Sequence, residues 1–313
     1  MNAKSKVAVI GAGFVGSSTA YALALRQVCS ELALIDVAAD KASGEVDDIR
    51  HGLPYLGHMD IYSGGYECVK DADLIIITAG ANRKPGETRL NLAKKNIAIA
   101  RSITDEIMKH YNGGVILVVS NPVDILTYMF TKWMGLPEGM VLGSGTSLDT
   151  VRFRSAIADL THVDVINIHG YIIGEHGDSQ VPAWSNTHIA GIQVDDYCRM
   201  TNITFDEKVK AGILEHVKTD GASIIKRKGA TYYGVSISIA MLANSILRGS
   251  NTIRVVSSVL DGQFGVSDVA LSLPTVIGKY GAQNVLTPIL TESEIEAFIK
   301  SAEACKAVLN DCI

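Results

Sequence analysis

Several patterns that mark nucleic-acid-binding and membrane proteins are missing from this sequence. The chain has 313 residues and a formal net charge of −5, and its longest basic runs are Lys94-Lys95 and Lys226-Arg227-Lys228. Such short basic runs on an acidic chain argue against a protein that binds the phosphate backbone of nucleic acid. No uninterrupted apolar run reaches the roughly 20 residues of a transmembrane helix. Because Met1 to Lys6 leads directly into a short apolar strand, we expect a cytoplasmic protein without a membrane or nucleic-acid partner.

The sequence also lacks cysteines and histidines at the spacing of a metal site. The five cysteines are odd in number and scattered over the chain, at Cys29, Cys68, Cys198, Cys305 and Cys312. None of them stands in a CxxC pair or a His-rich segment, so we expect reduced, mostly buried thiols and no metal site. With 47% hydrophobic and 19% charged residues, the chain has the composition of a core-forming globular protein of one large or two medium domains.

A dinucleotide-binding pattern opens the chain. The run Lys6–Ile10 is predicted as a buried parallel strand, and Gly11-Ala-Gly13-Phe-Val-Gly16 follows it at the start of a helical segment. A second apolar run ends at Asp36, 20 residues after Gly16. The glycines allow a tight turn and bring a pyrophosphate close to backbone N–H groups, while Asp36 can accept hydrogen bonds from ribose hydroxyls. Since this carboxylate would repel a 2′-phosphate, the sequence predicts NAD rather than NADP as the cofactor.

The fold class follows from the rhythm of the apolar runs. Further strands are predicted at 73–79, 114–120 and 141–143, with one helix marked by Leu92, Ile99, Ala100, Ile103 and Ile107 and another at 124–133. Strands this apolar are buried on both faces. The sequence therefore predicts an α/β protein whose residues 1–147 form a Rossmann domain, a doubly wound parallel sheet with helices on both sides.

From residue 148 the pattern changes. Longer helices are predicted at 206–219 and 223–247, the second interrupted near 228–234, and antiparallel strands at 252–260 and 269–273. A last helix is predicted after Thr291, which forms a capping-box pattern with Glu294. We therefore predict an α+β catalytic domain over residues 148–313.

The residues of a candidate proton-transfer site come from three segments. His176 follows an apolar run, Asp149 and Arg152 lie upstream of it, and Arg89 closes the Gly/Pro-containing loop 80–89. A lone histidine at a strand end is more often structural than catalytic. A carboxylate that orients it and two arginines that hold an anionic substrate complete a catalytic set. The loop suits a lid over a negatively charged ligand, although most charge-rich connections are ordinary solvated loops.

Six motifs together carry a resemblance to a known family. They are Gly11 to Gly16, Ala79-Gly-Ala-Asn-Arg-Lys-Pro-Gly-Glu-Thr-Arg89, Val119-Ser-Asn-Pro-Val-Asp124, Gly143-Ser-Gly-Thr-Ser-Leu-Asp149, Gly174-Glu-His-Gly-Asp178 and Lys228-Gly-Ala-Thr-Tyr-Tyr-Gly234. In this order, over essentially the whole length, the chain closely resembles the L-lactate/malate dehydrogenase family, and it looks most like the bacterial L-lactate dehydrogenases. It departs from them at Arg83, where those enzymes have glutamine and malate dehydrogenases have arginine.

The resemblance implies a role for each candidate residue. His176 would donate a proton to the ketone oxygen, with Asp149 on its other ring nitrogen. Arg152 would bind the C1 carboxylate of the substrate and Arg89 would stabilise charge on the ketone oxygen. The remaining assignments are cofactor binding for Gly11, Gly13, Gly16, Asp36 and Asn121, and substrate binding for Arg83, Asn121 and Thr231.

Three alternatives stay open at the level of function. Arg83 favours oxaloacetate and malate as the substrate pair, and the overall resemblance favours pyruvate and lactate. A non-catalytic NAD-binding sensor would need the glycines and Asp36 without the proton relay. The resemblance also implies a homotetramer or dimer, with fructose 1,6-bisphosphate bound at a subunit interface by Arg154 and His169; a structural ion pair for Arg154 and a core position for His169 are the competing interpretations.

Overall fold

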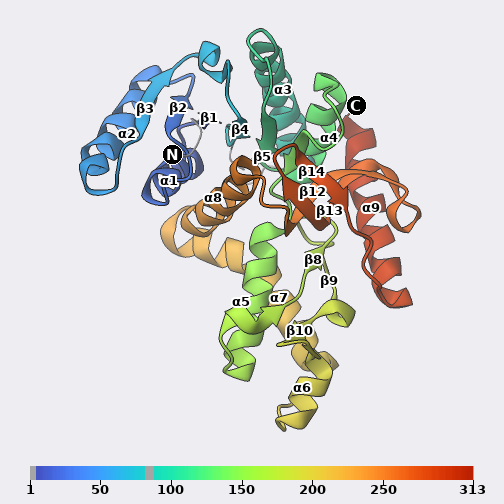
Figure 1. The fold of residues 1–313 in the computed structure, drawn as a ribbon. Helices are drawn as coiled ribbons and strands as arrows, with labels where there is room; N and C mark the ends of the chain where they lie inside the picture. Colours follow the sequence, from blue (N-terminus) through green and yellow to red (C-terminus); the bar gives the residue numbers. More distant parts are fainter. Residues whose placement is uncertain (1–4, 82–87, 313) are drawn as a thin grey trace.

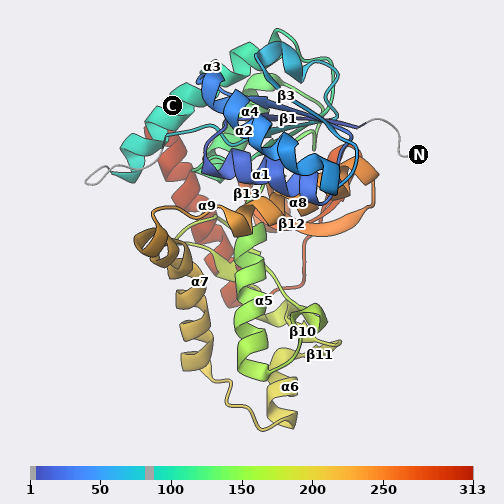
Figure 2. The same ribbon diagram turned by 90° about the vertical axis from the view of Figure 1, so that its left-hand side faces the viewer.

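The computed structural model describes residues 5–81 and 88–312, apart from the side chain of Arg89. In Figure 2 the N-terminal half and its sheet lie in the upper part of the molecule, and α5, α6 and α7 extend below it. The C-terminal helix α9 runs along one side between the two parts. The candidate site lies where these parts meet.

One nine-stranded sheet forms the frame of the molecule (Figure 1), in the order β14-β13-β12-β6-β5-β4-β1-β2-β3. Its parallel strands are β1 (Lys6–Ile10), β2 (Glu31–Ile35), β3 (Asp60–Gly64), β4 (Leu74–Ile77), β5 (Val115–Val118) and β6 (Val141–Gly143). The strands predicted in this half are confirmed. The prediction missed β3, an edge strand in which Ile61 is the one buried residue, so no apolar run marks it.

Helices cover both faces of this sheet. They are α1 (Phe14–Leu25), α2 (Ala39–Gly52), α3 (Arg89–Met108) and α4 (Val123–Met134). Alternate residues of β1 serve the two faces: Val7 and Val9 share a core cluster with residues of α1, α2 and α8, whereas Ala8 and Ile10 belong to a cluster with α3 and α4. This period of two in a strand buried on both sides explains why its sequence is continuously apolar.

The second half of the chain extends the same sheet. Strands β12 (Thr252–Asp261), β13 (Ser267–Gly278) and β14 (Gly281–Val285) are antiparallel, and β12 joins β6 at the pair Ser257 and Gly143. The prediction of antiparallel strands here is confirmed, but β14 was missed because three of its five residues are not buried. The division of the chain at residues 147 and 148 stays a prediction, because the sheet takes strands from both sides of it.

The lower part of the molecule is mainly helical. Its helices are α5 (Ser147–Thr161), α6 (Val194–Met200) and α7 (Glu207–Lys228), whereas α8 (Tyr233–Arg248) packs on the sheet beside α1 and α9 (Glu292–Cys312) runs along both parts. Short strands complete it: β7 (Ile168–His169), β8 (Ile172–Ile173), β9 (Val181–Pro182), β10 (His188–Ile189) and β11 (Ile192–Gln193). Single 3-10 turns stand at Leu53–Tyr55, Tyr66–Val69, Val165–Asn167, Trp184–Asn186 and Gln263–Gly265.

Two helix boundaries test the sequence predictions here. The predicted gap between residues 219 and 223 is wrong: α7 continues through it and ends at Gly229, whose φ of 86° is the left-handed C-cap conformation that favours glycine. The capping box of α9 is confirmed, because Thr291 N donates to Glu294 Oε2 (2.9 Å) and Glu294 N donates to Thr291 Oγ1 (3.3 Å).

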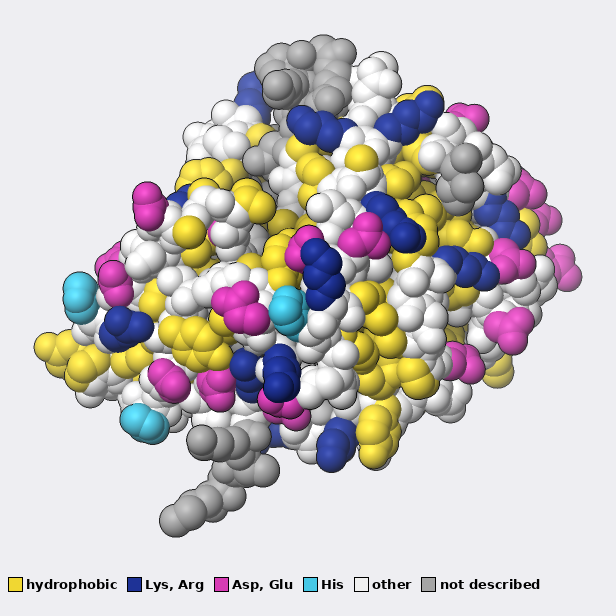
Figure 3. All heavy atoms as spheres, turned by 90° about the horizontal axis from the view of Figure 1, so that it is seen from above, with side chains coloured by type: hydrophobic (Ala, Val, Ile, Leu, Met, Phe, Trp, Pro, Cys, Tyr) yellow, Lys and Arg dark blue, Asp and Glu magenta, His cyan; other side chains and the backbone are white. Residues whose placement is uncertain are grey.

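The sequence predicts neither a membrane-spanning helix nor a metal site, and the described part of the chain can be compared with these two expectations. There, all helices fall short of the length or apolar character needed to cross a membrane, and His, Cys, Asp and Glu side chains form no group of three or more suited to a metal ion. All five cysteines are free, and Cys29, Cys198 and Cys305 are buried. On the face shown in Figure 3, basic side chains are interspersed with acidic ones.

Candidate active site

The glycine loop between β1 and α1 contains three glycines, and a different physical reason favours glycine at each of them. Gly11 has a φ of +107°, and a Cβ there would lie 2.7 Å from Ala79 N. At Gly16 a Cβ would lie 1.7 Å from Gly11 O, so only glycine allows α1 to pack on the turn. A Cβ at Gly13 would meet no described protein atom within 4 Å. That open side, at the N-terminus of α1, is suited to the close approach of a pyrophosphate.

Asp36 lies beside this loop at the end of β2. Its Oδ2 accepts a hydrogen bond from Ala12 N (2.6 Å) and its Oδ1 accepts one from Ala38 N (2.9 Å). A carboxylate has about four acceptor positions, so Asp36 can fix the loop and still accept from ribose hydroxyls. The residues present therefore fit a dinucleotide.

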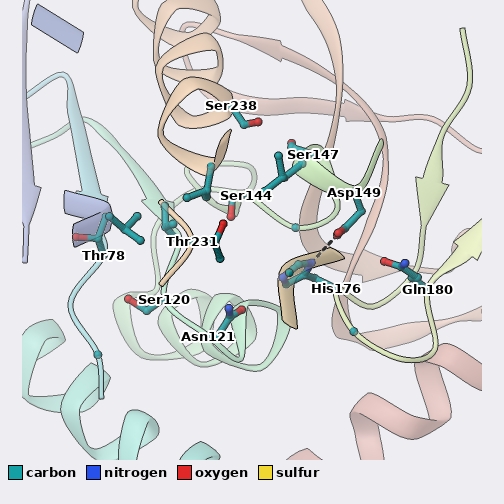
Figure 4. A pocket seen from close by; sticks show the side chains of 18 of the residues that line it. Thr78, Ser120, Asn121, Ser144, Ser147, Asp149, His176, Gln180, Thr231 and Ser238 are labelled. Atoms are coloured by element: carbon teal, nitrogen blue, oxygen red, sulfur yellow. Dashed lines mark hydrogen bonds and ion pairs between the residues drawn. The ribbon is translucent and has the colours of Figure 1, made fainter. Parts of the chain in front are cut away.

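A cavity of about 440 Å³ begins beside this loop and continues to His176. Figure 4 shows side chains from both halves of the chain pointing into it. Of the candidate residues, Asn121, Asp149, Arg152, His176 and Thr231 line the cavity. The structure thus brings together residues that are up to 110 positions apart, from Asn121 to Thr231.

At the centre of the cavity wall, Asp149 joins His176 and Arg152. Its Oδ2 lies 2.5 Å from His176 Nδ1, and its Oδ1 accepts a hydrogen bond from Arg152 Nη1 (2.9 Å). Asp149 is buried in the first turn of α5, and Arg152 lies one turn further on the same helix. Because Asp149 engages Nδ1, Nε2 is the ring nitrogen through which a proton would pass to a ligand.

The charges in this group shift its pKa values in opposite directions. Burial acts to raise the pKa of Asp149, but the His176 and Arg152 charges and their hydrogen bonds hold it below its ordinary value. Chiefly the Asp149 charge, opposed by burial, raises the pKa of His176 to about 9. At neutral pH the imidazole is therefore protonated, which is the form that donates to a ketone oxygen.

The segment that carries His176 is attached to the C-terminal helix. Glu175 N donates to Ser301 Oγ of α9 (2.9 Å), and Ser179 Oγ lies 3.0 Å from the same hydroxyl and donates to Glu175 Oε2. Ser301 is fully buried. A Cβ at Gly174, where φ is +85°, would lie 2.8 Å from Ser301 Oγ. The glycine before Glu175 thus allows α9 to hold this segment closely.

Sequence reasoning missed Asn96, which ties two loops of the site together. Asn96 of α3 accepts from Ala81 N (2.7 Å) through Oδ1, and its Nδ2 donates to Ala81 O (3.1 Å) and Asn121 O (2.7 Å). The available signal was a polar residue among the buried positions Ala93, Ala100, Ile103 and Ile107 of one helix face. Such a residue needs buried partners.

Gln180 is a second residue that the sequence did not indicate. It lines the cavity on the His176 side, as Figure 4 shows, and is buried. Among the described protein atoms its Nε2 has no hydrogen-bond partner. Its amide is therefore available to a polar ligand in the cavity.

Several predicted site residues are placed elsewhere or are not described. Arg83 lies outside the described residues, as does the side chain of Arg89, whose backbone begins α3. Arg154 Nε donates to Gly170 O (3.0 Å), and its guanidinium lies over the Tyr171 ring at 5.8 Å, away from the catalytic cavity. His169 is exposed on β7 opposite His188, so its interpretation as a core histidine is wrong.

A glycine loop with a carboxylate suited to ribose hydroxyls, next to a cavity lined by a protonated histidine and a half-buried arginine, defines a dinucleotide-dependent oxidoreductase that acts on small anions. Residues 5–143 match the NAD-binding domain of lactate/malate dehydrogenase, and residues 146–313 match the α/β C-terminal domain of the same enzymes. The chain belongs to the lactate/malate dehydrogenase family, and it is an NAD-dependent oxidoreductase.

Individual relatives are similar over nearly the whole chain. An L-lactate dehydrogenase of Thermoanaerobacter sp. is 47% identical over 307 residues, covering 98% of this chain and 99% of the relative. One from Acetivibrio thermocellus is 47% identical over 304 residues, covering 97% and 96%. The crystal structure of the minor L-lactate dehydrogenase of Enterococcus mundtii in its ligand-bound form has a TM-score of 0.95 at 41% identity, covering 98% of each chain.

Proposed function

We propose that the protein is an L-lactate dehydrogenase that interconverts pyruvate and L-lactate. The observation that carries this proposal is the His176–Asp149–Arg152 group on one cavity wall, in a chain whose full-length relatives from Thermoanaerobacter and Acetivibrio carry that name. These relatives favour lactate over the malate preference that Arg83 suggests. The cytoplasm is the compartment that we propose for it, with no nucleic-acid or membrane partner.

The proposed reaction assigns one task to each described residue. Arg152 binds the substrate carboxylate through guanidinium N–H groups and so fixes the orientation of the C2 carbon. Bound NADH supplies the hydride that C2 receives. His176 gives its Nε2 proton to the ketone oxygen, and Asp149 stabilises the charged imidazole before that transfer. In lactate oxidation His176 takes the proton back.

The malate preference remains a second candidate because of Arg83. Pyruvate presents a methyl group to the substrate loop, whereas oxaloacetate presents a second carboxylate that a guanidinium matches in shape and sign. Hydrogen bonds to charged groups contribute about 1.5–3 kcal/mol each. One such hydrogen bond from Arg83 would favour oxaloacetate by a factor of about 10 to 150. Thr231, the proposed residue on the opposite side of the substrate, is of the lactate type.

Specificity constants for pyruvate and oxaloacetate, measured with NADH, decide between these substrates. We expect the higher kcat/KM for pyruvate. In Arg83→Gln the value for oxaloacetate should fall by a factor of about ten or more, whereas the matched variant Lys84→Gln, which removes a neighbouring cation, should change it little. A higher kcat/KM for oxaloacetate in the unmodified protein would make malate dehydrogenase the correct function.

We also propose a homotetramer or dimer with an effector site for fructose 1,6-bisphosphate at Arg154 and His169. Large apolar side chains are exposed on the adjacent helices α1 and α8, among them Tyr21, Leu25, Tyr233 and Ile237. Arg154 reaches the carbonyl of Gly170, the residue that follows His169. Both side chains thus belong to neighbouring positions of one chain, and two chains could place their pairs around a bisphosphate.

Sedimentation velocity tests this assembly. We expect an oligomer, and a tighter one when fructose 1,6-bisphosphate is added at low salt, because phosphate charges would bridge the cations of two chains. The response should be lost in Arg154→Gln and His169→Gln and kept in His188→Gln, a histidine on the paired strand. No response in the unmodified protein would remove the effector site, and a monomer would remove the assembly.

A further inference from the structure

A second carboxylate lies next to His176 and contacts its backbone rather than its ring. Asp124 stands in the first turn of α4 and is buried. Its Oδ2 accepts a hydrogen bond from the backbone N of His176 (2.7 Å), and its Oδ1 accepts one from Ser257 Oγ (2.6 Å). The resemblance gave Asp124 no task in the site.

Ser257 connects this carboxylate to the frame of the molecule. It is fully buried on β12, and it is the residue that pairs with Gly143 where the antiparallel strands join the parallel ones. Asp124 is therefore held from two sides, by the start of α4 and by the sheet. Because the N-terminus of a helix carries partial positive charge, α4 also stabilises the ionised form of Asp124.

The charged groups around His176 come from four segments of the chain. Asp149 and Arg152 belong to α5, Asp124 belongs to α4, and Glu175 and Asp178 flank the histidine in its own segment. Lys218 of α7 lines the same cavity. Of these groups, Asp124 is bonded to the backbone of the histidine and Asp149 to its ring, so the two carboxylates hold the same residue at different points.

The titration behaviour of the two groups is consistent with this arrangement. Burial raises the pKa of Asp124 to about 6, although the hydrogen bonds from Ser257 and His176 and the His176 charge act to lower it. The pKa of His176 is raised chiefly by the Asp149 charge, against the effect of burial, and also by the hydrogen bond to Asp149. The Asp124 charge makes a smaller contribution in the same upward direction. Asp124 is therefore mostly ionised above neutral pH, where His176 loses its proton.

We propose that Asp124 is a positioning residue for the proton donor: it fixes the backbone of His176 and adds a second negative charge that favours the protonated imidazole. This inference rests on the proposed catalytic role of His176. An ionised carboxylate accepts hydrogen bonds at both oxygens, so one residue can satisfy the His176 N–H and the Ser257 hydroxyl together. Asp124 is buried, so its charge is less screened by water than a surface charge, which increases its effect at a given distance.

The variant Asp124→Asn separates the charge from the hydrogen bonds. Asparagine has nearly the same shape; its Oδ1 can accept from His176 N and its amide can donate to Ser257 Oγ. Loss of the charge should lower the pKa of the His176 imidazole by about half a unit to one unit. The shift is measured by NMR titration of protein with 13C-labelled histidine, with the His176 signal assigned through His176→Gln. The alkaline limb of kcat/KM for keto-acid reduction should move to lower pH by the same amount.

Ser257→Ala is a second, milder variant that keeps the charge and removes one of its donors. The pKa of Asp124 should then rise from about 6, but the carboxylate stays ionised near pH 9, where His176 titrates, so we expect the His176 titration to remain close to that of the unmodified protein. Thr127→Val, one helical turn further along α4, is the control and should leave the His176 titration unchanged. Bound NADH, measured by fluorescence, shows that each variant retains the dinucleotide site.

Two results would contradict the inference. One is an unchanged His176 titration in Asp124→Asn, even if the thermal stability of the variant falls, because a purely structural carboxylate would give that pattern. The other is a shift to higher pH. A failure of the proposed function is distinguishable: the NMR titration would still move in Asp124→Asn while the unmodified protein reduced no 2-keto acid.

Discussion

At the scale of single residues, carboxylates have opposite environments and different tasks. Asp36 stands at a strand end, accepting from Ala12 N and Ala38 N, with acceptor positions left for a ribose. Asp149 is buried, and its two oxygens contact His176 and Arg152. In the proposed reaction the first selects the cofactor through its remaining acceptor positions, and the second acts on the substrate through the histidine.

Asp36 should set the preference for NADH over NADPH. A 2′-phosphate placed against this carboxylate costs several kcal/mol at the dielectric of a protein surface, so kcat/KM should favour NADH by about two powers of ten or more. In Asp36→Asn the ratio should fall, because the repulsion is removed while one acceptor oxygen remains. Comparable specificity constants for the two cofactors in the unmodified protein would show that Asp36 does not have this role.

At the scale of elements, the sequence predicted the helices and strands that are determined by a local residue pattern. The strand β1 is apolar because it is buried on both sides, and the capping box of α9 needs only Thr291 and Glu294. Edge strands such as β3 and β14 have few buried residues and give no comparable pattern. Asn96 and Asp124 could not be assigned roles, because their partners lie on segments that only the fold brings near.

The glycine loop gives a prediction at this scale, with a matched pair of variants. In Gly16→Ala the new Cβ would lie 1.7 Å from Gly11 O, so α1 must shift and both stability and NADH binding should fall. Overpacking of this kind typically costs about 1–3 kcal/mol of unfolding free energy. In Gly13→Ala no described protein atom lies within 4 Å and the φ of −73° suits alanine, so stability should stay the same or rise, while NADH binding weakens.

Thermal unfolding and NADH titration of the two variants measure these effects. Equal loss of stability in both would contradict the distinction between a packing glycine and a ligand-facing glycine. Unchanged NADH affinity in Gly13→Ala would mean that the pyrophosphate does not approach the loop at this residue.

At the scale of the whole molecule, the active site depends on the junction of the two halves. Figure 1 shows one sheet that contains strands from both halves, and Figure 4 shows the cavity at their meeting point. In the proposed reaction the loop between β1 and α1 holds the cofactor, and α5 and the His176 segment, which α9 anchors through Ser301, carry the proton transfer. The shared sheet keeps these two sides of the cavity in a fixed relation.

The pH dependence of keto-acid reduction in the unmodified protein and in His176→Gln tests the central claim most directly. With NADH and pyruvate, kcat/KM should be highest where His176 is protonated and should fall as the pH rises through its pKa of about 9. His176→Gln should lose about 10²–10⁴-fold in rate, because it lacks the general acid, and should have no such alkaline limb, while its affinity for NADH stays nearly unchanged. A variant that keeps most of the activity, with the alkaline limb still present, would contradict His176 as the proton donor.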